Sequence, residues 1–337
     1  MPHAQHPVGT GFTAFSTVED VMAGVDLVGT NVVITGGHSG LGLVTTRALS
    51  AAGAAVTVAA RDPKRAARAV IGIRRVEVEQ LDLLDPASID AFAARYRRSG
   101  RPLHILVNNA GLPSVGGLQH DARGYEAQLA VNHLGHFQLT LGLQPVLRAA
   151  GGARVVTTSS GAHRMSDILW DDPHFRTGRH HPDLAYSQSK TANVLFTVEL
   201  DRRWSDGGIR AFAPHPGIVP ATAFNGSAGD EARRAMGLID DLGNPIIDPA
   251  RGVKTLEQGA ATIVLAAASP LLAGLGGVYL NNGDVSPVDA SAGPVDMSNP
   301  PADVAPHAID SGSAHRLWEL SERLVGTPTL ETYSLVV

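Results

Sequence analysis

The sequence contains no cysteine and little lysine, tyrosine or tryptophan, and these absences exclude several classes of protein. Its 337 residues include 5 Tyr and 3 Trp, and its lysines are Lys64, Lys190 and Lys254. Without cysteine the chain has no disulfide framework, no thiolate metal site and no cysteine nucleophile. Its formal net charge of −5 argues against the basic surface that a nucleic-acid partner requires. We therefore expect no nucleic-acid binding.

Long hydrophobic runs are also missing. The longest apolar stretch, 260–275, is short for a membrane span and contains Pro270. The N-terminus lacks the basic and apolar pattern of a signal peptide. We therefore expect a cytoplasmic protein with no membrane span. We also predict no metal site, because the histidines lack an acidic or cysteine framework at metal-binding spacing; they are His133, His136, His163, His174, His180 and His181.

Strand-like and helix-like stretches alternate along most of the chain. The predicted strands are 31–35, 54–60, 75–81, 103–108, 153–159, 209–213 and 278–280. The predicted helices are 17–23, 41–52, 63–70, 86–98, 122–149, 184–204, 256–268 and 315–324, the fifth with a break near Gly142 or Pro145. Strands separated by helices indicate βαβ crossovers and a parallel sheet covered on both faces. The pattern predicts one α/β domain, doubly wound and Rossmann-type, with a seven-stranded parallel sheet.

The remaining segments divide the chain further. Residues 1–27 form an N-terminal lead-in, 28–285 the predicted domain and 286–337 a C-terminal extension. Within the domain, 218–254 is rich in Gly, Pro and Asp and is typical of a mobile flap over a substrate.

A glycine-rich turn follows the first predicted strand. Gly36, Gly40 and Gly42 allow a tight turn, close approach to a pyrophosphate, and close packing of helix against strand. The helix that follows offers free N–H groups and a positive dipole end to an anion. A purely structural turn is the alternative, but the strand–turn–helix context favours a dinucleotide site. The expected contacts are Gly36, His38, Ser39, Gly40, Leu41 and Gly42.

The end of the second strand bears on the choice of cofactor. An acidic residue there would bind the adenosine ribose diol and favour NAD. The position instead holds Ala60, followed by Arg61, which could pair with a 2′-phosphate. Asp62 either caps the next helix or, if the strand ends one residue later, favours NAD(H). We predict that NADP(H) is preferred, with NAD(H) the alternative.

Tyr186 and Lys190 lie four residues apart on a predicted helix. That spacing places both side chains on one face, about 5–6 Å apart at Cβ. A cation beside a tyrosine favours phenolate and lowers the tyrosine pKa, which makes the hydroxyl usable as an acid or base near neutral pH. The alternative is a solvated pair on a helix surface.

Together these motifs resemble the short-chain dehydrogenase/reductase family, over roughly residues 28–285, and in particular its retinol-dehydrogenase-like branch. The glycine turn, Asn108–Gly111 and the Tyr186/Lys190 pair occur in the family's order. The supporting segments are 131–137, 154–160, 192–196 and 215–217.

The resemblance implies four catalytic residues. Tyr186 would transfer the proton at the carbonyl or alcohol oxygen, and Lys190 would lower its pKa and hold the nicotinamide ribose. Ser160 would polarise the substrate oxygen, in preference to Ser159 on the opposite face of the strand. Asn132 would position a water that connects Lys190 to solvent.

The resemblance also implies cofactor contacts along the edge of the sheet. Besides Tyr186 and Lys190, they are Asp82 and Leu83 at the adenine, Asn109, Ala110 and Gly111 at the adenosine ribose, and Pro216, Gly217 and Val219 at the nicotinamide. One departure follows Val219, since the family's Val-x-Thr is here Val-Pro-Ala-Thr, which displaces Thr222 by one position. Family resemblance further suggests a homodimer or homotetramer through helices 122–149 and 184–204.

We therefore expect an NAD(P)-dependent oxidoreductase that interconverts an alcohol and a ketone or aldehyde, with a bulky lipophilic small molecule as substrate. The alternative is a catalytically silent NAD(P)-binding sensor of the same fold. A Ser-His-Asp hydrolase is excluded because Ser160 has no Gly-x-Ser-x-Gly elbow.

Overall fold

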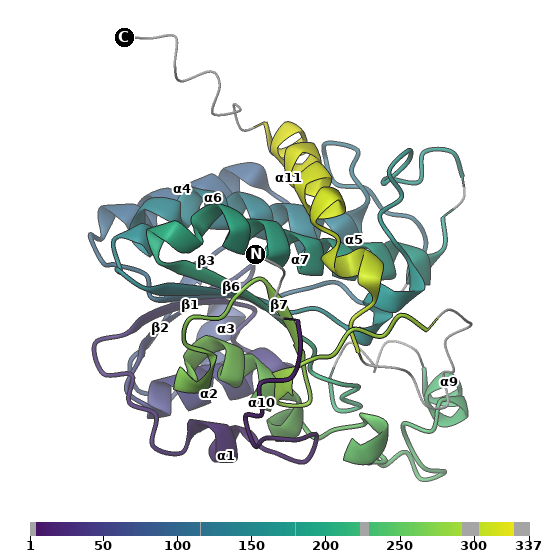
Figure 1. The fold of residues 1–337 in the computed structure, drawn as a ribbon, viewed down its shortest axis with the longest axis horizontal. Helices are drawn as coiled ribbons and strands as arrows, with labels where there is room; N and C mark the ends of the chain where they lie inside the picture. The colour runs from purple at the N-terminus through teal and green to yellow at the C-terminus, as the bar shows by residue number, and fades with distance from the viewer. Residues whose placement is uncertain (1–4, 115, 179, 223–228, 292–302, 327–337) are drawn as a thin grey trace.

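A single twisted sheet forms the middle layer of the molecule (Figure 1). The computed structural model describes residues 5–114, 116–178, 180–222, 229–291 and 303–326. The sheet has the strand order β3-β2-β1-β4-β5-β6-β7-β8. The strands are β1 (Asn31–Thr35), β2 (Ala55–Ala60), β3 (Val76–Gln80), β4 (Ile105–Asn108), β5 (Ala153–Thr157), β6 (Ile209–Pro214), β7 (Val278–Asn281) and β8 (Asp284–Val285).

Helices cover both faces of this sheet (Figure 1). On one face lie α1 (Val18–Met22), α2 (Gly40–Ala51) and α10 (Leu256–Ala268). On the other lie α4 (Pro86–Arg98), α6 (Gly135–Arg148) and α7 (Pro182–Trp204), with α11 (Ser311–Val325) packed outside α7. The shorter helices are α3 (Pro63–Ala69), α5 (Ala127–Leu129) and α9 (Asp230–Ala235).

The strand residues alternate between two hydrophobic cores. Val32 and Ile34 belong to the core beneath α2 and α10, whereas Val33 belongs to the core beneath α4, α6 and α7. All three side chains are fully buried. Burial on both faces explains why these strands are continuous apolar runs in the sequence. The doubly wound α/β fold predicted from the sequence is confirmed.

The sheet departs from the prediction at one edge, where it has an eighth strand and an antiparallel pair. β8 pairs with β7 through Leu280↔Val285 and Asn281↔Asp284. The two residues of the turn, Asn282 and Gly283, both have positive φ, 51° and 81°. Asn-Gly at these positions is the preferred sequence of a two-residue hairpin turn. The expected seven-stranded, all-parallel sheet is therefore corrected to seven parallel strands and one short antiparallel strand.

The helix predicted over 122–149 begins later and is interrupted elsewhere. The Asp121 carboxylate accepts hydrogen bonds from the backbone N–H groups of Arg123 and Tyr125, which keeps this stretch in a turn. α5 starts only at Ala127, and a π-helical segment over Ala130–Leu134 separates it from α6. The break lies there rather than near Gly142 or Pro145. π-Helical bulges of this kind often occur at functional sites.

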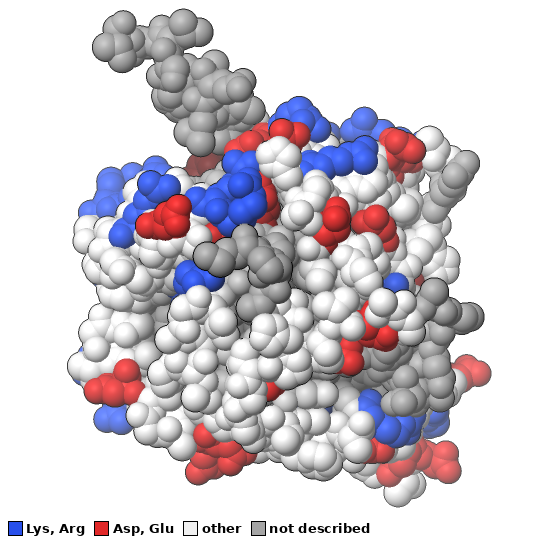
Figure 2. Space-filling view, in the orientation of Figure 1, with Lys and Arg blue, Asp and Glu red and all other residues white. Residues whose placement is uncertain are grey.

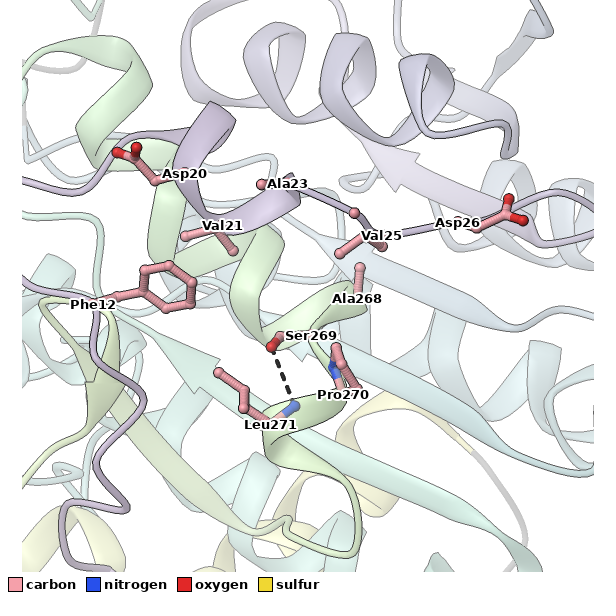
Figure 3. A pocket seen from close by; sticks show the side chains of 11 residues that line it. Phe12, Asp20, Val21, Ala23, Val25, Asp26, Ala268, Ser269, Pro270 and Leu271 are labelled. Atoms are coloured by element: carbon pink, nitrogen blue, oxygen red, sulfur yellow. Dashed lines mark hydrogen bonds between the residues drawn. The ribbon is translucent and has the colours of Figure 1, made fainter.

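The N-terminal end of the described chain bonds to the edge of the sheet. The Gln5 side-chain amide donates to the carbonyls of Tyr279 on β7 and Ser286 just after β8, and accepts from the Tyr279 N–H. The lead-in helix α1 packs against α10 beside a surface hollow of about 410 Å³ lined by residues such as Phe12 and Leu271 (Figure 3). None of the predicted site residues lines this hollow.

The surface carries charges of both signs. On the face drawn in Figure 2, Lys and Arg side chains lie among Asp and Glu side chains, with uncharged areas between them. In the described parts of the chain, no helix has the length and apolar character needed to cross a bilayer.

Candidate active site

The predicted site residues gather where the parallel strands end. The glycine turn follows β1, Asn109 follows β4, Ser160 follows β5 and Pro216 follows β6. β1 and β4 are neighbours although they are not consecutive in sequence. Ligands of open α/β sheets bind outside the carboxyl ends of the strands at such a switch point.

The glycine turn has the tight geometry predicted for it. Gly36 and Gly40 have φ of 68° and 49°, a region that side chains rarely adopt. A Cβ on Gly42 would lie 2.6 Å from Asn109 Nδ2 and would overlap the Gly36 carbonyl. Ser39 precedes α2 without capping it through its side chain, so the first N–H groups of that helix are not satisfied by this hydroxyl.

Thr35 ties the turn to the end of β4. Its hydroxyl accepts hydrogen bonds from the N–H groups of Asn109 (2.9 Å) and Ala110 (3.0 Å). The hydroxyl lies 2.8 Å from His136 Nε2 and donates its proton to that nitrogen. Gly111 continues this stretch. The predicted contacts at 36–42 and 109–111 therefore form one connected surface.

His38 supplies the test of whether this surface fits a dinucleotide. Its Nδ1 is buried and has no hydrogen-bond partner within the described residues. Burial lowers the pKa of His38, and the positive charge of Arg65 lowers it further. Arg61 is exposed directly after β2, which ends at Ala60. An unpaired polar atom beside cationic side chains and a glycine cradle fits an anionic, phosphate-bearing ligand.

Asp62 has a structural role at the same edge. Its carboxylate caps α3 by accepting a hydrogen bond of 3.0 Å from the Arg65 N–H. The capping bond lowers the pKa of Asp62. Because β2 ends at Ala60, the strand-end position is not acidic.

Tyr186, Lys190 and Ser160 meet at the other end of this edge. The Ser160 hydroxyl hydrogen-bonds the Tyr186 phenol. Lys190 Nζ lies 5.6 Å from the centre of the Tyr186 ring and donates a bond of 3.1 Å to the Thr158 carbonyl. Lys190 is 4% exposed, so this is not a solvated pair on a helix surface.

The pKa of Tyr186 shifts in the direction opposite to the one expected from the sequence. Burial raises the pKa of Tyr186 to about 12, although the bond from Ser160 opposes the rise. Burial lowers the pKa of Lys190 to about 8. The predicted fall in the tyrosine pKa is therefore wrong for this structure, because the loss of solvent outweighs the hydrogen bond from Ser160.

Ser159 and Ser160 differ in what their hydroxyls contact. Ser159 Oγ donates to the Lys190 carbonyl at 3.0 Å and thus braces the backbone of α7. Ser160 Oγ accepts from the Ala162 N–H at 3.2 Å and remains beside Tyr186. The geometry favours Ser160 for contact with a substrate.

Asn132 sits inside the π-helical segment and connects two parts of the site. Its amide donates to Ser189 Oγ (2.9 Å) and to the Leu112 carbonyl, and its carbonyl accepts from the Leu112 N–H. Its backbone carbonyl lies 3.1 Å from His136 Nδ1. Asn132 therefore joins the loop after β4 to the helical turn that carries Tyr186 and Lys190.

The predicted adenine contacts lie after β3. The Asp82 carboxylate accepts from the Leu84 N–H at 3.0 Å, and its N–H donates to Ser88 Oγ at 2.9 Å. A Cβ on Gly135 would lie 2.6 Å from the Leu83 carbonyl oxygen, so α6 packs closely against this loop.

The predicted nicotinamide contacts lie after β6. Gly217 has φ of 82°. A Cβ on Gly259 would meet Val219 at 2.6 Å, Leu41 at 2.9 Å and the Pro216 carbonyl at 3.3 Å. The loop after β6 therefore lies against the start of α2. The displaced Thr222 also lies here, with its methyl 3.7 Å from a Cβ placed on Gly40 and its hydroxyl bonded to the Val219 carbonyl.

Sequence reasoning missed a second buried lysine and the buried histidines around the site. Lys254 is 1% exposed, and burial lowers its pKa to about 8. A Cβ on Gly217 would lie 2.9 Å from Lys254 Cδ. His163 and His215 flank Ser160 and are also buried. The rarity of lysine was the one signal in the sequence that could have drawn attention to Lys254.

The chain is similar to known proteins. The family model described as short chain dehydrogenase matches residues 30–233. A probable oxidoreductase of Streptomyces lividans is 48% identical over 242 residues, covering 70% of this chain and 79% of that protein. Human retinol dehydrogenase 12 is 40% identical, covering 67% of this chain and 71% of that protein.

A crystal structure of an uncharacterized protein from Mycobacterium paratuberculosis is similar over a longer stretch. It is 34% identical with a TM-score of 0.68, covering 91% of this chain and 97% of that one. The family model spans more than half of the residues of the chain. The chain is a retinol-dehydrogenase-like member of the short-chain dehydrogenase/reductase family and an NAD(P)-dependent oxidoreductase.

Proposed function

We propose that the protein interconverts a bulky, lipophilic alcohol and the corresponding ketone or aldehyde, with NADP(H) as the preferred cofactor and Tyr186 as the acid and base. The observation that carries this proposal is the hydrogen bond between the Ser160 and Tyr186 hydroxyls beside a buried Lys190. Two hydroxyl donors that converge on one point are suited to an oxygen atom on which negative charge develops.

The chain's residues divide the work of the reaction. When bound, the nicotinamide cofactor supplies or accepts the hydride. In the reducing direction, Ser160 and Tyr186 donate hydrogen bonds to the substrate oxygen, and Tyr186 then transfers its proton to that oxygen. Lys190 holds the nicotinamide ribose and stabilises the tyrosinate that results. Asn132, which is hydrogen-bonded to Ser189, positions a water that returns the proton from solvent.

The cofactor-binding residues support a phosphate-bearing dinucleotide. The turn from Gly36 to Gly42 would hold the pyrophosphate, and the unpaired His38 Nδ1 is available to the ligand. Asp82 and Leu83 would border the adenine, and Asn109 to Gly111 the adenosine ribose. The nicotinamide would lie against Pro216, Gly217 and Val219.

The substrate class is supported by the apolar character of the flap and by the names of relatives. Leu242 is 87% exposed and Met236 45%, and Ile246 and Ile247 are also exposed. These apolar side chains belong to the proposed flap, where they would be available for contact with a lipophilic ligand. Residues 223–228 of the proposed flap lie outside the described part of the chain. Retinol, in the name of a relative, is an apolar alcohol.

Location and assembly remain part of the proposal. We propose a cytoplasmic protein that forms a homodimer or homotetramer. α11 packs on α7, one of the two helices expected at such an interface.

The function is tested with purified protein, NADPH or NADH, and a panel of lipophilic ketones and aldehydes, following cofactor absorbance. The proposal expects turnover of at least one member of the panel. The proposal would be contradicted if the protein bound NADPH but turned over no carbonyl with NADPH and no alcohol with NADP⁺. That result would favour the catalytically silent sensor.

Arg61→Ala tests the choice of cofactor. Because Arg61 is exposed after β2 and no carboxylate occupies the strand end, the variant should bind NADPH about tenfold more weakly and NADH almost unchanged. Titration of both cofactors by fluorescence measures the effect. Arg47→Ala, an exposed change on α2, is the matched control. Equal weakening of both cofactors would contradict the predicted preference.

A further inference from the structure

The peptide group between Ser160 and Gly161 is held by two buried histidines. Its carbonyl oxygen lies 2.7 Å from His163 Nδ1, and its N–H donates a bond of 3.2 Å to His215 Nδ1. His163 is fully buried and His215 is 7% exposed. The two rings therefore bind both polar atoms of the one peptide that directly follows Ser160.

The hydrogen-bond partners assign a different tautomer to each ring. His163 Nε2 accepts a bond of 3.0 Å from the Ala305 N–H, so the proton is on Nδ1, which donates to the Ser160 carbonyl. His215 Nδ1 accepts from Gly161 and, at 3.4 Å, from Gly217, so its proton is on Nε2. His163 thus presents an N–H donor to the Ser160 carbonyl, and His215 presents an acceptor nitrogen to the Gly161 N–H.

Both rings pack on the same side chain of β7. The centre of the Tyr279 ring lies 4.8 Å from that of His163 and 6.4 Å from that of His215. The Thr191 hydroxyl, one residue after Lys190, donates to the His163 carbonyl at 2.9 Å. Contacts with β7 and with the helix that carries Tyr186 therefore fix the orientation of the two histidine rings.

The C-terminal extension also holds His163 in place. Ala305 binds His163 Nε2, and His307 Nε2 lies 3.0 Å from the His163 carbonyl. The neighbouring Arg164 donates to the Asp303 carbonyl and the Asp289 carboxylate, each at 2.8 Å. A segment more than 140 residues away in sequence therefore sets the tautomer of the ring that binds the Ser160 carbonyl.

We propose that His163 and His215 are positioning residues for Ser160, and that the extension at residues 303–307 completes this clamp. Rotation of the Ser160–Gly161 peptide would move the Ser160 hydroxyl away from the point where it meets Tyr186. A displacement of about 1 Å in such a group can lower a rate about a hundredfold. The inference rests on the proposed function, because it assigns a role in the reaction to Ser160.

Two substitutions of His163 test the roles of its two ring nitrogens separately. In His163→Gln the amide can reach Ala305 but is placed to replace Nε2 and not Nδ1, so the side-chain bond to the Ser160 carbonyl is lost and the bond of 3.1 Å from the backbone N–H of residue 163 remains. In His163→Asn the amide can replace Nδ1 and keep that bond. We expect kcat to fall about 10- to 100-fold in H163Q and clearly less in H163N, with the KM for the carbonyl and the Kd for NADPH nearly unchanged. The primary deuterium isotope effect on kcat, measured with 4-deuterated NADPH, should increase in H163Q.

His315→Ala is the matched control. His315 belongs to the same extension but contacts Glu199 (3.1 Å) on an exposed part of α11, away from Ser160. A purely structural role for His163 predicts lower thermal stability with unchanged kcat in H163Q, as in H315A, and that result would overturn the proposal. Unequal kcat values of H163Q and H163N in the expected order would support it.

A measurement without substrate distinguishes failure of the clamp from failure of the proposed function. Hydrogen exchange of the peptide covering 159–166 should be faster in H163Q than in the wild type and in H315A. Equal exchange in all three proteins would overturn the clamp, whether or not the wild type reduces a carbonyl. Absence of wild-type turnover, with faster exchange in H163Q, would contradict the catalytic role of Ser160 and leave the clamp supported.

Discussion

Single glycines determine how closely backbone can approach backbone in the phosphate turn. Gly42 lies where any Cβ would overlap the Gly36 carbonyl and approach Asn109 Nδ2 at 2.6 Å. Neither neighbour can move easily, since Asn109 also donates to the Thr35 carbonyl at 3.0 Å. The close packing of the start of α2, the turn and the end of β4 therefore requires glycine at position 42.

Gly42→Ala should destabilise the protein and weaken cofactor binding together. Overpacking of this kind costs about 1–3 kcal/mol. We expect a lower free energy of unfolding in urea and at least tenfold weaker NADPH binding by fluorescence. Gly152→Ala is the control, because a Cβ there meets nothing within 4 Å and should change stability by less than about 0.5 kcal/mol. Equal behaviour of the two variants would show that the turn tolerates a side chain.

Residue spacing predicted the Tyr186–Lys190 pair but not the state of its protons. A four-residue interval places two side chains on one face of a helix, whatever surrounds the helix. Their pKa values depend on burial, which comes from segments distant in sequence. For the same reason no local spacing predicted the surroundings of His163 and Lys254, since their partners, Ala305 and Gly217, become neighbours only in the folded chain.

Among the helices, α11 shows how the C-terminal extension is joined to the rest of the fold. Trp318 is 3% exposed and packs against the rings of Phe137, Phe196 and Trp204, with centroid separations of 4.9, 5.9 and 5.9 Å. Arg203 lies over the indole at 4.6 Å. α11, which lies beside α7 (Figure 1), therefore covers aromatic side chains from both α6 and α7.

Trp318→Ala should loosen α11 and expose this aromatic cluster. Removal of a buried Trp costs about 3–5 kcal/mol. We expect a lower melting temperature, dye binding to exposed apolar surface, and faster hydrogen exchange in α11. Arg323→Ala, on the exposed side of the same helix, should leave all three unchanged. A normal melting temperature in W318A would mean that α11 is not anchored by its tryptophan.

Element boundaries were predictable where a local signal exists and not elsewhere. The sequence predicted α4 and α10 correctly because Asp85 and Thr255 cap their first turns. The Asn282-Gly283 turn of the last hairpin was also a local signal, but β8 has only two residues, too short for an alternating pattern. The π-helical segment around Asn132 had none, because its side-chain contacts with Leu112 and Ser189 are tertiary.

Over the whole molecule, buried histidines link stability to pH. Burial lowers the pKa of His133, His163 and His215 to about 3, and that of His136 and His174 to about 4. Their ordinary value is 6.5, so below pH 6.5 the unfolded chain binds protons that the folded chain does not. These groups therefore contribute stability above pH 6.5 that is lost progressively as the pH falls towards 3.

Stability should consequently decrease at a milder acidity than carboxylate titration alone would cause. Each such histidine contributes a slope of up to roughly 1.4 kcal/mol per pH unit below pH 6.5. Urea unfolding at pH 7.5, 6.5, 5.5 and 5.0 measures the trend. His133→Gln, which removes one titrating group that contacts Ser321, Phe137 and Phe196, should reduce the slope. Constant stability from pH 7.5 to 5.0 would contradict the burial of neutral histidines.

The most direct measurement on the central claim compares Tyr186→Phe with the wild type on a carbonyl that the wild type reduces. Loss of the phenol removes the proton donor beside Ser160 while the residues of the phosphate turn stay unchanged. NADPH oxidation should fall at least a thousandfold, with the Kd for NADPH within about twofold of the wild type. Tyr125→Phe, which removes a hydroxyl bonded to the Leu324 carbonyl, should keep full activity. Undiminished turnover by the Tyr186→Phe variant would contradict the proposed role of Tyr186.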